Sequence, residues 1–127
     1  MSFKLNHIHI LCKDLIGMRD FFVDMLEAKL IEMKQFGGAD GASLDLSEVK
    51  INLRVGQEGE KIATDPDGKI YGYHHVGLDV EDLDAAYKKL SDKGFVFSVP
   101  PKDLPGLRVA FFDGPENITF ELMQTVS

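Results

Sequence analysis

A nine-residue pattern occurs twice in this chain, and no other feature limits the possible folds as strongly. The segment HIHILCKDL, which begins at His7, aligns without a gap with HVGLDVEDL, which begins at His75, 68 positions later. Both copies start with a histidine and a β-branched residue, and both end with Asp-Leu. Chance is the alternative explanation, but further features recur at nearly the same offset. The repeat therefore predicts two equivalent modules.

Each copy of the pattern predicts a strand that leads into a helix. Asp14 and Asp82 stand where an N-cap carboxylate accepts hydrogen bonds from the first turn of a helix. Apolar residues follow both aspartates at helical spacing. Gly94 is expected to end the second helix, and the first helix, which lacks such a glycine, is expected to end near Glu27.

Short strands follow each predicted helix, so both modules have the order βαβββ. Alternating apolar and polar residues, bounded by turn residues such as Ser47-Glu48 and the run from Asp113 to Asn117, mark these strands. We expect an α+β fold in one domain, 1–127, with module one at about 1–57, a linker at about 58–71 and module two at about 72–127. The predicted strands after the helices are 30–34, 42–46 and 49–55 in module one, and 95–99, 108–112 and 118–123 in module two.

Two loops are predicted from their glycines and prolines. Residues 35–41 contain three glycines and an aspartate, which indicates a mobile rim. Residues 99–106 contain three prolines, which indicates a rigid wall in front of the next strand.

Strand alternation predicts which side chains share a surface. One face of the strands is aliphatic enough to be buried under the helices, whereas the other carries polar groups. By the same parity His74 is placed away from His75. We expect a curved, cup-like mixed sheet with the helices outside, and a polar lining of this kind is costly to build for stability alone. The lining is predicted to contain His7, His9, Asn52, Arg54, His75 and Glu121.

The two copies of the nine-residue pattern, and the order of the elements predicted around them, make this chain resemble the vicinal oxygen chelate superfamily. The resemblance covers essentially the whole chain. That family includes glyoxalase I, methylmalonyl-CoA epimerase, fosfomycin-resistance proteins, extradiol dioxygenases and bleomycin-binding proteins. A single copy of the form H-[IV]-x-[IL]-x-x-x-D-L would be weak evidence, but two copies at this spacing are specific. The resemblance implies that the first and last strands of each module supply metal ligands.

When the ligand positions of the family are transferred to this sequence, the resemblance implies a metal site with four candidate ligands: His7, Asn52, His75 and Glu121. Asn52 stands where glyoxalases and epimerases have glutamate or glutamine, and a neutral amide is a weak ligand for a transition metal. We therefore expect His7, His75 and Glu121 to bind one divalent ion, which can be Fe, Mn, Ni, Co or Zn. Two histidines and one carboxylate would leave open positions for water and substrate.

The remaining polar residues are assigned to substrate and catalysis. Glu121, if it loosens from the metal, and His9 are the candidate catalytic groups. Asn52, Arg54, His9 and Arg108 are the candidate substrate contacts, and the two arginines suit an anionic group. Alternatives remain open: Asn52 could be a ligand, His9 a hydrogen-bonded wall residue, and Glu121 the partner of an arginine.

The expected function is that of a metal-dependent enzyme acting on a small oxygenated molecule chelated through neighbouring oxygens. The reaction type, whether dioxygenase, lyase or isomerase, stays open. The alternative is a metal-free protein that sequesters a ligand, as the bleomycin binders do, with His7 and His75 paired to carboxylates.

Charge and cysteine content limit which binding partners and which cell compartment we expect for this protein. The net charge of −7 and the lack of a basic run argue against nucleic acid and against an anionic membrane surface. The chain has one cysteine, Cys12, and no signal or membrane-spanning pattern, so we expect the cytoplasm. Exposed sheet edges predict a homodimer.

Overall fold

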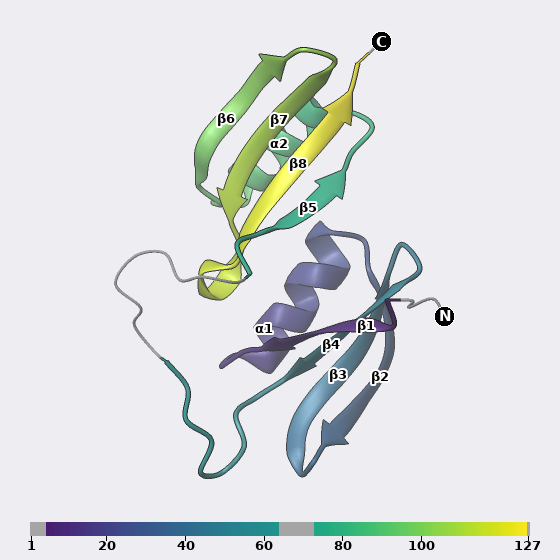
Figure 1. The fold of residues 1–127 in the computed structure, drawn as a ribbon, viewed down its shortest axis with the longest axis vertical. Helices are drawn as coiled ribbons and strands as arrows, with labels where there is room; N and C mark the ends of the chain where they lie inside the picture. The colour runs from purple at the N-terminus through teal and green to yellow at the C-terminus, as the bar shows by residue number, and fades with distance from the viewer. Residues whose placement is uncertain (1–4, 64–72, 127) are drawn as a thin grey trace. The chain divides into compact units, whose positions relative to one another are not determined.

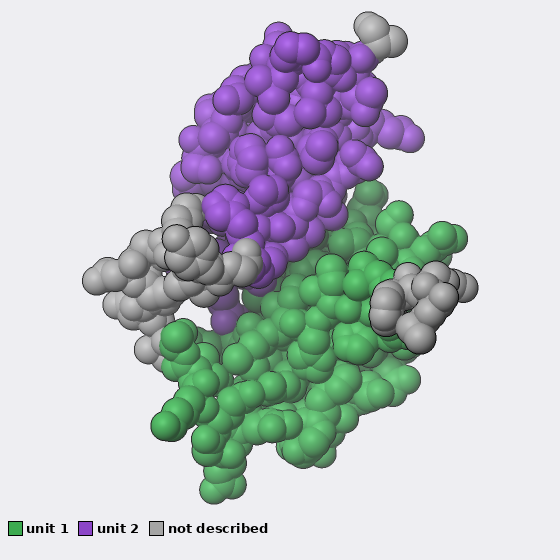
Figure 2. All heavy atoms as spheres, viewed as in Figure 1, with its two compact units in different colours: residues 1–64 green, residues 65–127 purple. Residues whose placement is uncertain are grey.

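The chain folds into two compact units, residues 1–64 and residues 65–127 (Figure 2). The computed structural model describes residues 5–63 and 73–126. Each unit holds one helix and one four-stranded mixed sheet, which confirms the predicted tandem βαβββ modules (Figure 1). Of the predicted linker at about 58–71, residues 64–71 lie outside the described residues. In the part of the chain that is described, no helix is long and apolar enough to cross a membrane.

The first unit places its opening strand beside its closing strand. Strand β1 runs parallel to β4, and the remaining pairs are antiparallel, so the sheet order is β1-β4-β3-β2. Helix α1 packs against β3 and β4. The elements are β1 (His7–Leu11), α1 (Leu15–Asp20), a π-helical turn (Phe21–Met25), β2 (Lys29–Phe36), β3 (Ala39–Leu46) and β4 (Val49–Arg54).

Helix α1 begins and ends through identifiable backbone contacts. The Asp14 carboxylate accepts a hydrogen bond from the Gly17 amide at 2.9 Å, as expected of an N-cap. The helix then widens into the π-helical turn. Glu27 takes a positive φ of 62°, and the Ala28 amide donates to the Phe22 carbonyl at 2.9 Å. Glu27 thus fills the left-handed position that glycine usually occupies at a helix end.

The second unit repeats the same arrangement. Its sheet order is β5-β8-β7-β6, with β5 parallel to β8. The Asp82 carboxylate accepts from the Ala85 amide at 3.1 Å, and Gly94, with φ 94°, follows the helix as predicted. The elements are β5 (Val76–Asp79), α2 (Leu83–Asp92), β6 (Phe97–Leu104), β7 (Leu107–Asp113), a 3-10 turn (Pro115–Asn117) and β8 (Thr119–Thr125).

Each unit has its own apolar core on the helix side of its sheet. Alternation along β4 and β8 sends apolar side chains to that side, so the intervening residues lie on the other face. Helix residues complete each core. The buried side chains include Met18, Phe21, Phe22, Ala42, Leu44, Ile51 and Leu53 in the first unit, and Leu83, Leu90, Ala110, Phe112, Phe120 and Leu122 in the second.

The predicted loop at residues 35–41 is instead a tight β-hairpin. Strands β2 and β3 pair up to Phe36 and Ala39. The two residues between them, Gly37 and Gly38, have φ of 57° and 87°. Two-residue hairpin turns require such positive φ values, so the glycines continue the sheet rather than form a rim.

The predicted proline wall at residues 99–106 is for the most part a strand. Pro100 and Pro101 lie within β6, where the register to β7 shifts between Val99 and Lys102. Strand β6 is at the edge of its sheet. An edge strand with an irregular register tolerates prolines because their missing N–H groups break no regular ladder.

Candidate functional site

The second unit brings together two of the predicted metal ligands. His75 immediately precedes β5, and Glu121 lies on β8. The His75 Nε2 atom is 3.3 Å from the Glu121 Oε1 atom. Both side chains are partly buried, with 31% and 18% exposed. Phe111, which pairs with Glu121 across β7 and β8, places its ring 5.4 Å from the His75 ring.

His74 contacts His75 directly, contrary to the parity prediction. The Nδ1 atoms of the two rings are 2.8 Å apart, and the rings are nearly perpendicular at 81°. Strand parity fails here because both residues precede β5, which begins at Val76. The two nitrogens of His75 therefore face different partners, His74 at Nδ1 and Glu121 at Nε2.

The His75–Glu121 pair has the chemistry and spacing of two ligands on one metal. Imidazole nitrogen and carboxylate oxygen are common donors for divalent transition metals, at about 2.0–2.2 Å from the ion. Two such donors on neighbouring coordination positions are about 3 Å apart, close to the observed 3.3 Å. Within residues 5–63 and 73–126, no group of three or more His, Cys, Asp or Glu side chains is arranged to hold a metal.

The first unit carries the corresponding polar face on β1 and β4. His9 pairs with Asn52, and Asn52 pairs with Ser43 on β3. Asn52 is only 6% exposed, and its Oδ1 accepts a hydrogen bond from the Ser43 hydroxyl at 2.5 Å. Asn52 is equivalent by register to Glu121, but its amide oxygen is already bonded to a neighbouring side chain. This contact favours a supporting role for Asn52 over a metal-ligand role.

The two histidines of β1 lie on the same face, as strand alternation predicted. Their ring centroids are 6.2 Å apart, and the His9 ring meets the edge of Phe36 at 4.9 Å. His7 is exposed, and its Nδ1 lies 2.8 Å from the Asn6 Oδ1 atom. Burial, and then the charges of Arg54 and His7, lower the pKa of His9 below its ordinary value. A neutral His9 can accept a proton or a hydrogen bond.

Arg54 is engaged by an internal carboxylate. Its NH1 and NH2 groups donate to the two oxygens of Glu60 at 2.8 and 2.7 Å, and NH1 also donates to the Val55 carbonyl at 3.0 Å. The hydrogen bond from Arg54 and the backbone hydrogen bond from Gln57 lower the pKa of Glu60 to about 2. An anionic substrate group would therefore compete with Glu60 for this guanidinium.

Arg108 does not lie with the other predicted site residue of this sheet, Glu121. It pairs with Gln124 in the sheet, and the Gln124 side chain accepts a hydrogen bond from the first residue of α2, Leu83. Arg108 itself donates to Asp84 of α2 and to Asp103. It therefore lies on the helix side of the sheet, opposite the face of Glu121, and it serves as a bridge between α2 and β6. Glu121 has His75 as its partner rather than an arginine.

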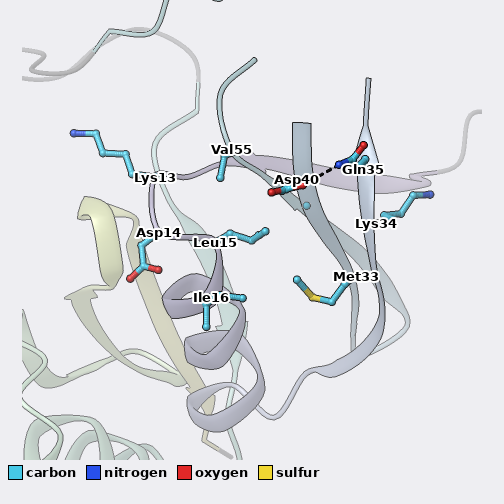
Figure 3. Close-up of a pocket in the computed structure, with 10 residues that line it drawn as sticks. Lys13, Asp14, Leu15, Ile16, Met33, Lys34, Gln35, Asp40 and Val55 are labelled. Atoms are coloured by element: carbon cyan, nitrogen blue, oxygen red, sulfur yellow. Dashed lines mark hydrogen bonds between the residues drawn. The ribbon is translucent and has the colours of Figure 1, made fainter. Parts of the chain in front are cut away.

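A hollow of about 510 Å³ lies elsewhere in the first unit, between the start of α1 and the β2–β3 hairpin (Figure 3). Leu15 and Met33 point toward each other across it. Its carboxylates have structural partners, because Asp14 caps α1 and Asp40 accepts from Gln35 at 3.0 Å. None of the predicted site residues line it. The lining residues are Lys13, Asp14, Leu15, Ile16, Met33, Lys34, Gln35, Asp40, Gly41 and Val55.

Sequence reasoning missed several neighbours of the site. Phe111 could have been found, because hairpin alternation in β7 and β8 places it on the face of Glu121. Ser43 could have been found in the same way from its place opposite Asn52. His74 and Glu60 could not, because neither lies in a strand and no periodicity predicts where their side chains point.

Comparisons with known proteins agree with this architecture. A family model, the Glyoxalase/Bleomycin resistance protein/Dioxygenase superfamily, matches residues 4–122. A comparison with curated protein sequences gives no match.

Three solved structures illustrate the likeness of fold. The glyoxylase/bleomycin resistance protein/dioxygenase domain from Frankia sp. EAN1pec is 24% identical, with a TM-score of 0.81 over 99% of this chain and 100% of that one. A glyoxalase family protein from Bacillus cereus is 18% identical, with a TM-score of 0.84 over 100% and 97%. A mutant of the fosfomycin resistance protein FosX from Listeria monocytogenes, in complex with Mn(II) and 1S,2S-dihydroxypropylphosphonic acid, is 20% identical, with a TM-score of 0.76 over 99% and 95%. The family match covers nearly the whole chain, and this chain therefore belongs to the Glyoxalase/Bleomycin resistance protein/Dioxygenase superfamily.

Proposed function

We propose that this protein is a metal-dependent enzyme that acts on a small oxygenated substrate, with 1–127 as a single vicinal oxygen chelate domain. His7, His75 and Glu121 are the proposed ligands of one divalent ion. The observation that carries the proposal is the approach of His75 Nε2 to Glu121 Oε1, at a spacing that suits two donors on one metal. The manganese complex of FosX, a protein of similar fold, gives further support.

Each polar residue has a proposed part in the reaction. When bound, a divalent metal supplies a Lewis acid for two neighbouring oxygens of the substrate. His9, whose pKa is lowered by burial and by the nearby charges of Arg54 and His7, accepts a proton or a hydrogen bond from the substrate. Asn52 orients the substrate from a buried position, and Arg54 takes an anionic group of the substrate in exchange for Glu60. Glu121 serves as a base only if it loosens from the metal.

Metal loading tests the proposal. Protein stripped with a chelator should take up about one ion per chain when incubated separately with Fe(II), Mn(II), Ni(II), Co(II) or Zn(II). Elemental analysis after gel filtration measures the uptake. A protein that stays empty with all five metals, and binds a bulky organic ligand instead, would be a sequestering protein.

Substitutions of Asn52 test whether this residue binds the metal directly or only contacts the neighbouring side chains and the substrate. Asn52→Ala should lower the free energy of unfolding by about 1–3 kcal/mol, because the buried Ser43 hydroxyl loses its partner. The same variant should keep its metal, with affinity lowered less than about tenfold, because the Asn52 side chain is hydrogen-bonded to Ser43 and not to a proposed ligand. Asn52→Glu should bind metal more tightly, because it adds a charged oxygen ligand. Loss of the ion in Asn52→Ala, measured by chelator competition, would make Asn52 a ligand.

We also propose a cytoplasmic homodimer. Strands β1, β2, β5 and β6 are the outer strands of their sheets, and β2 exposes Leu30, Ile31 and Met33. Exposed apolar edge strands favour association. The single cysteine, Cys12, is buried directly after β1, which fits a reducing compartment. Sedimentation at micromolar concentration should give twice the mass of one chain, and a strict monomer would contradict the dimer.

A further inference from the structure

The ring of His75 is held by contacts on three sides. Its Nδ1 lies 2.8 Å from the Nδ1 of His74, and its Nε2 lies 3.3 Å from the Glu121 carboxylate. The Phe111 ring packs against it at 5.4 Å, nearly perpendicular at 81°. Only one of the two His75 nitrogens can therefore face the proposed metal, and it is the one beside Glu121.

Hydrogen-bond chemistry fixes what the other nitrogen must do. Two imidazole nitrogens 2.8 Å apart share one proton, so one of them donates and the other accepts. A histidine that binds a metal through Nε2 uses the lone pair of that nitrogen, so its proton resides on Nδ1. The Nδ1–H of His75 then needs an acceptor, and the His74 Nδ1 atom stands within hydrogen-bond distance. In this arrangement His74 would carry its own proton on Nε2, and its side chain is exposed to solvent.

We propose that His74 is a positioning residue for His75: it accepts the Nδ1–H hydrogen bond of His75 and so presents the Nε2 lone pair to the metal. This inference rests on the proposed metal site. Partners of this kind fix the tautomer and the ring orientation of a ligating histidine, and they raise its basicity as a ligand. His74 neither touches the metal nor contacts the substrate in this role.

The local backbone explains how two consecutive histidines can cooperate. Within a strand, adjacent side chains point to opposite faces and cannot meet. His74 and His75 lie before the first paired residue of β5, Val76, so this alternation does not separate them. A regular strand that began two residues earlier, at His74, would have sent the two side chains to opposite faces and removed the contact.

Three substitutions of His74 separate hydrogen bonding from packing. In His74→Asn, the side-chain Oδ1 occupies nearly the position of the histidine Nδ1 and can accept the same bond. In His74→Phe, a ring of similar size remains but the acceptor is lost. His74→Ala removes both. Because the side chain is exposed, all three variants should fold like the wild type.

Metal affinity is the first measurement, by competition between the protein and a chromogenic chelator for Co(II) or Zn(II). His74→Ala and His74→Phe should bind the metal 10–100-fold more weakly than the wild type, the usual cost of removing the partner of a ligating histidine. His74→Asn should stay within a few-fold of the wild type. Affinity in His74→Phe equal to that of the wild type, or in His74→Asn as weak as in His74→Ala, would overturn the proposal.

The second measurement observes the proton directly. In zinc-loaded wild type labelled with ¹⁵N, His75 should show a protonated Nδ1 whose proton is protected from exchange, and His74→Phe should lose that protection. An Nδ1 proton equally protected in both proteins would overturn the role of His74. If the wild type binds no metal at all, the proposed function fails along with this inference. If it binds metal but no His74 variant differs from it, the inference alone fails.

Discussion

His75→Ala and Glu121→Ala should each abolish stoichiometric metal binding while leaving the fold intact. The two side chains face each other at 3.3 Å, and we propose that they supply a nitrogen and a charged oxygen to the same ion. Losing a direct ligand should weaken binding on the order of a hundredfold or more, since losing a supporting contact already costs 10–100-fold. Elemental analysis and circular dichroism of the same samples measure metal content and folding.

Asp79→Ala is the matched control for these variants. Asp79 is a carboxylate of β5, on the same strand face as Gly77, and it is exposed. It pairs in register with Met123 rather than with Glu121. Its removal should leave the metal content unchanged. Full metal occupancy in Glu121→Ala, or equal loss in Asp79→Ala, would contradict the assignment of His75 and Glu121 as ligands.

Chain mixing extends the first prediction to the proposed dimer. A His7→Ala chain and a Glu121→Ala chain are each expected to be empty. If the sites of a dimer are shared between chains, half of the randomly formed dimers are mixed and each contains one intact site, so about a quarter of the metal sites should return. If each chain holds its own site, none should return. Metal content after unfolding and refolding the mixture distinguishes the two arrangements.

Phe112→Ala should cause the largest loss of stability that a single core substitution produces in the second unit. Phe112 is fully buried and stacks on Phe120, with ring centroids 5.3 Å apart. Its ring also lies 5.2 Å from that of Phe97 and 5.9 Å from that of Phe95. Truncating a buried phenylalanine costs about 3–5 kcal/mol, a large share of the 5–15 kcal/mol typical of a folded domain. Urea denaturation measures the change.

Val96→Ala provides the control for the core variant. Val96 is 70% exposed, and its truncation should change the free energy of unfolding by no more than about 0.5 kcal/mol. If Phe112→Ala lost less than about 1 kcal/mol, the aromatic cluster would not be the core of this unit.

Strand periodicity correctly predicted the sheet face on which the residues of β1, β4 and β8 lie. His7, His9, Asn52 and Glu121 lie on the faces that alternation predicts, because the period of two is a property of the extended backbone itself. The same rule, applied to β7, would have placed Arg108 on the helix side. The prediction of Arg108 as a substrate contact rested instead on its charge, and in the structure that charge is paired with Asp84 and Asp103.

Turns and edges were harder to predict than faces. The glycines at 37 and 38 and the prolines at 100 and 101 were interpreted as loop residues, although they lie in a hairpin turn and in an edge strand. Glycine and proline report a local backbone requirement, and that requirement is met equally by a loop, a tight turn or an irregular strand. Which of these forms depends on the neighbouring strands, and the residues themselves do not specify it.

The sequence by itself determined that this chain is a tandem pair of βαβββ modules with a histidine at the start of each, because the repeat, the caps and the alternation are all local signals. Only the tertiary structure decided which side chains meet. Strand register brings Asn52 to Ser43 and Glu121 toward His75. The contacts of His74 with His75 and of Glu60 with Arg54 depend on backbone outside the strands and on side-chain conformation. Register joins segments that lie up to 46 positions apart in the chain, as His75 and Glu121 do, and the free energy that selects it comes from packing the core as a whole.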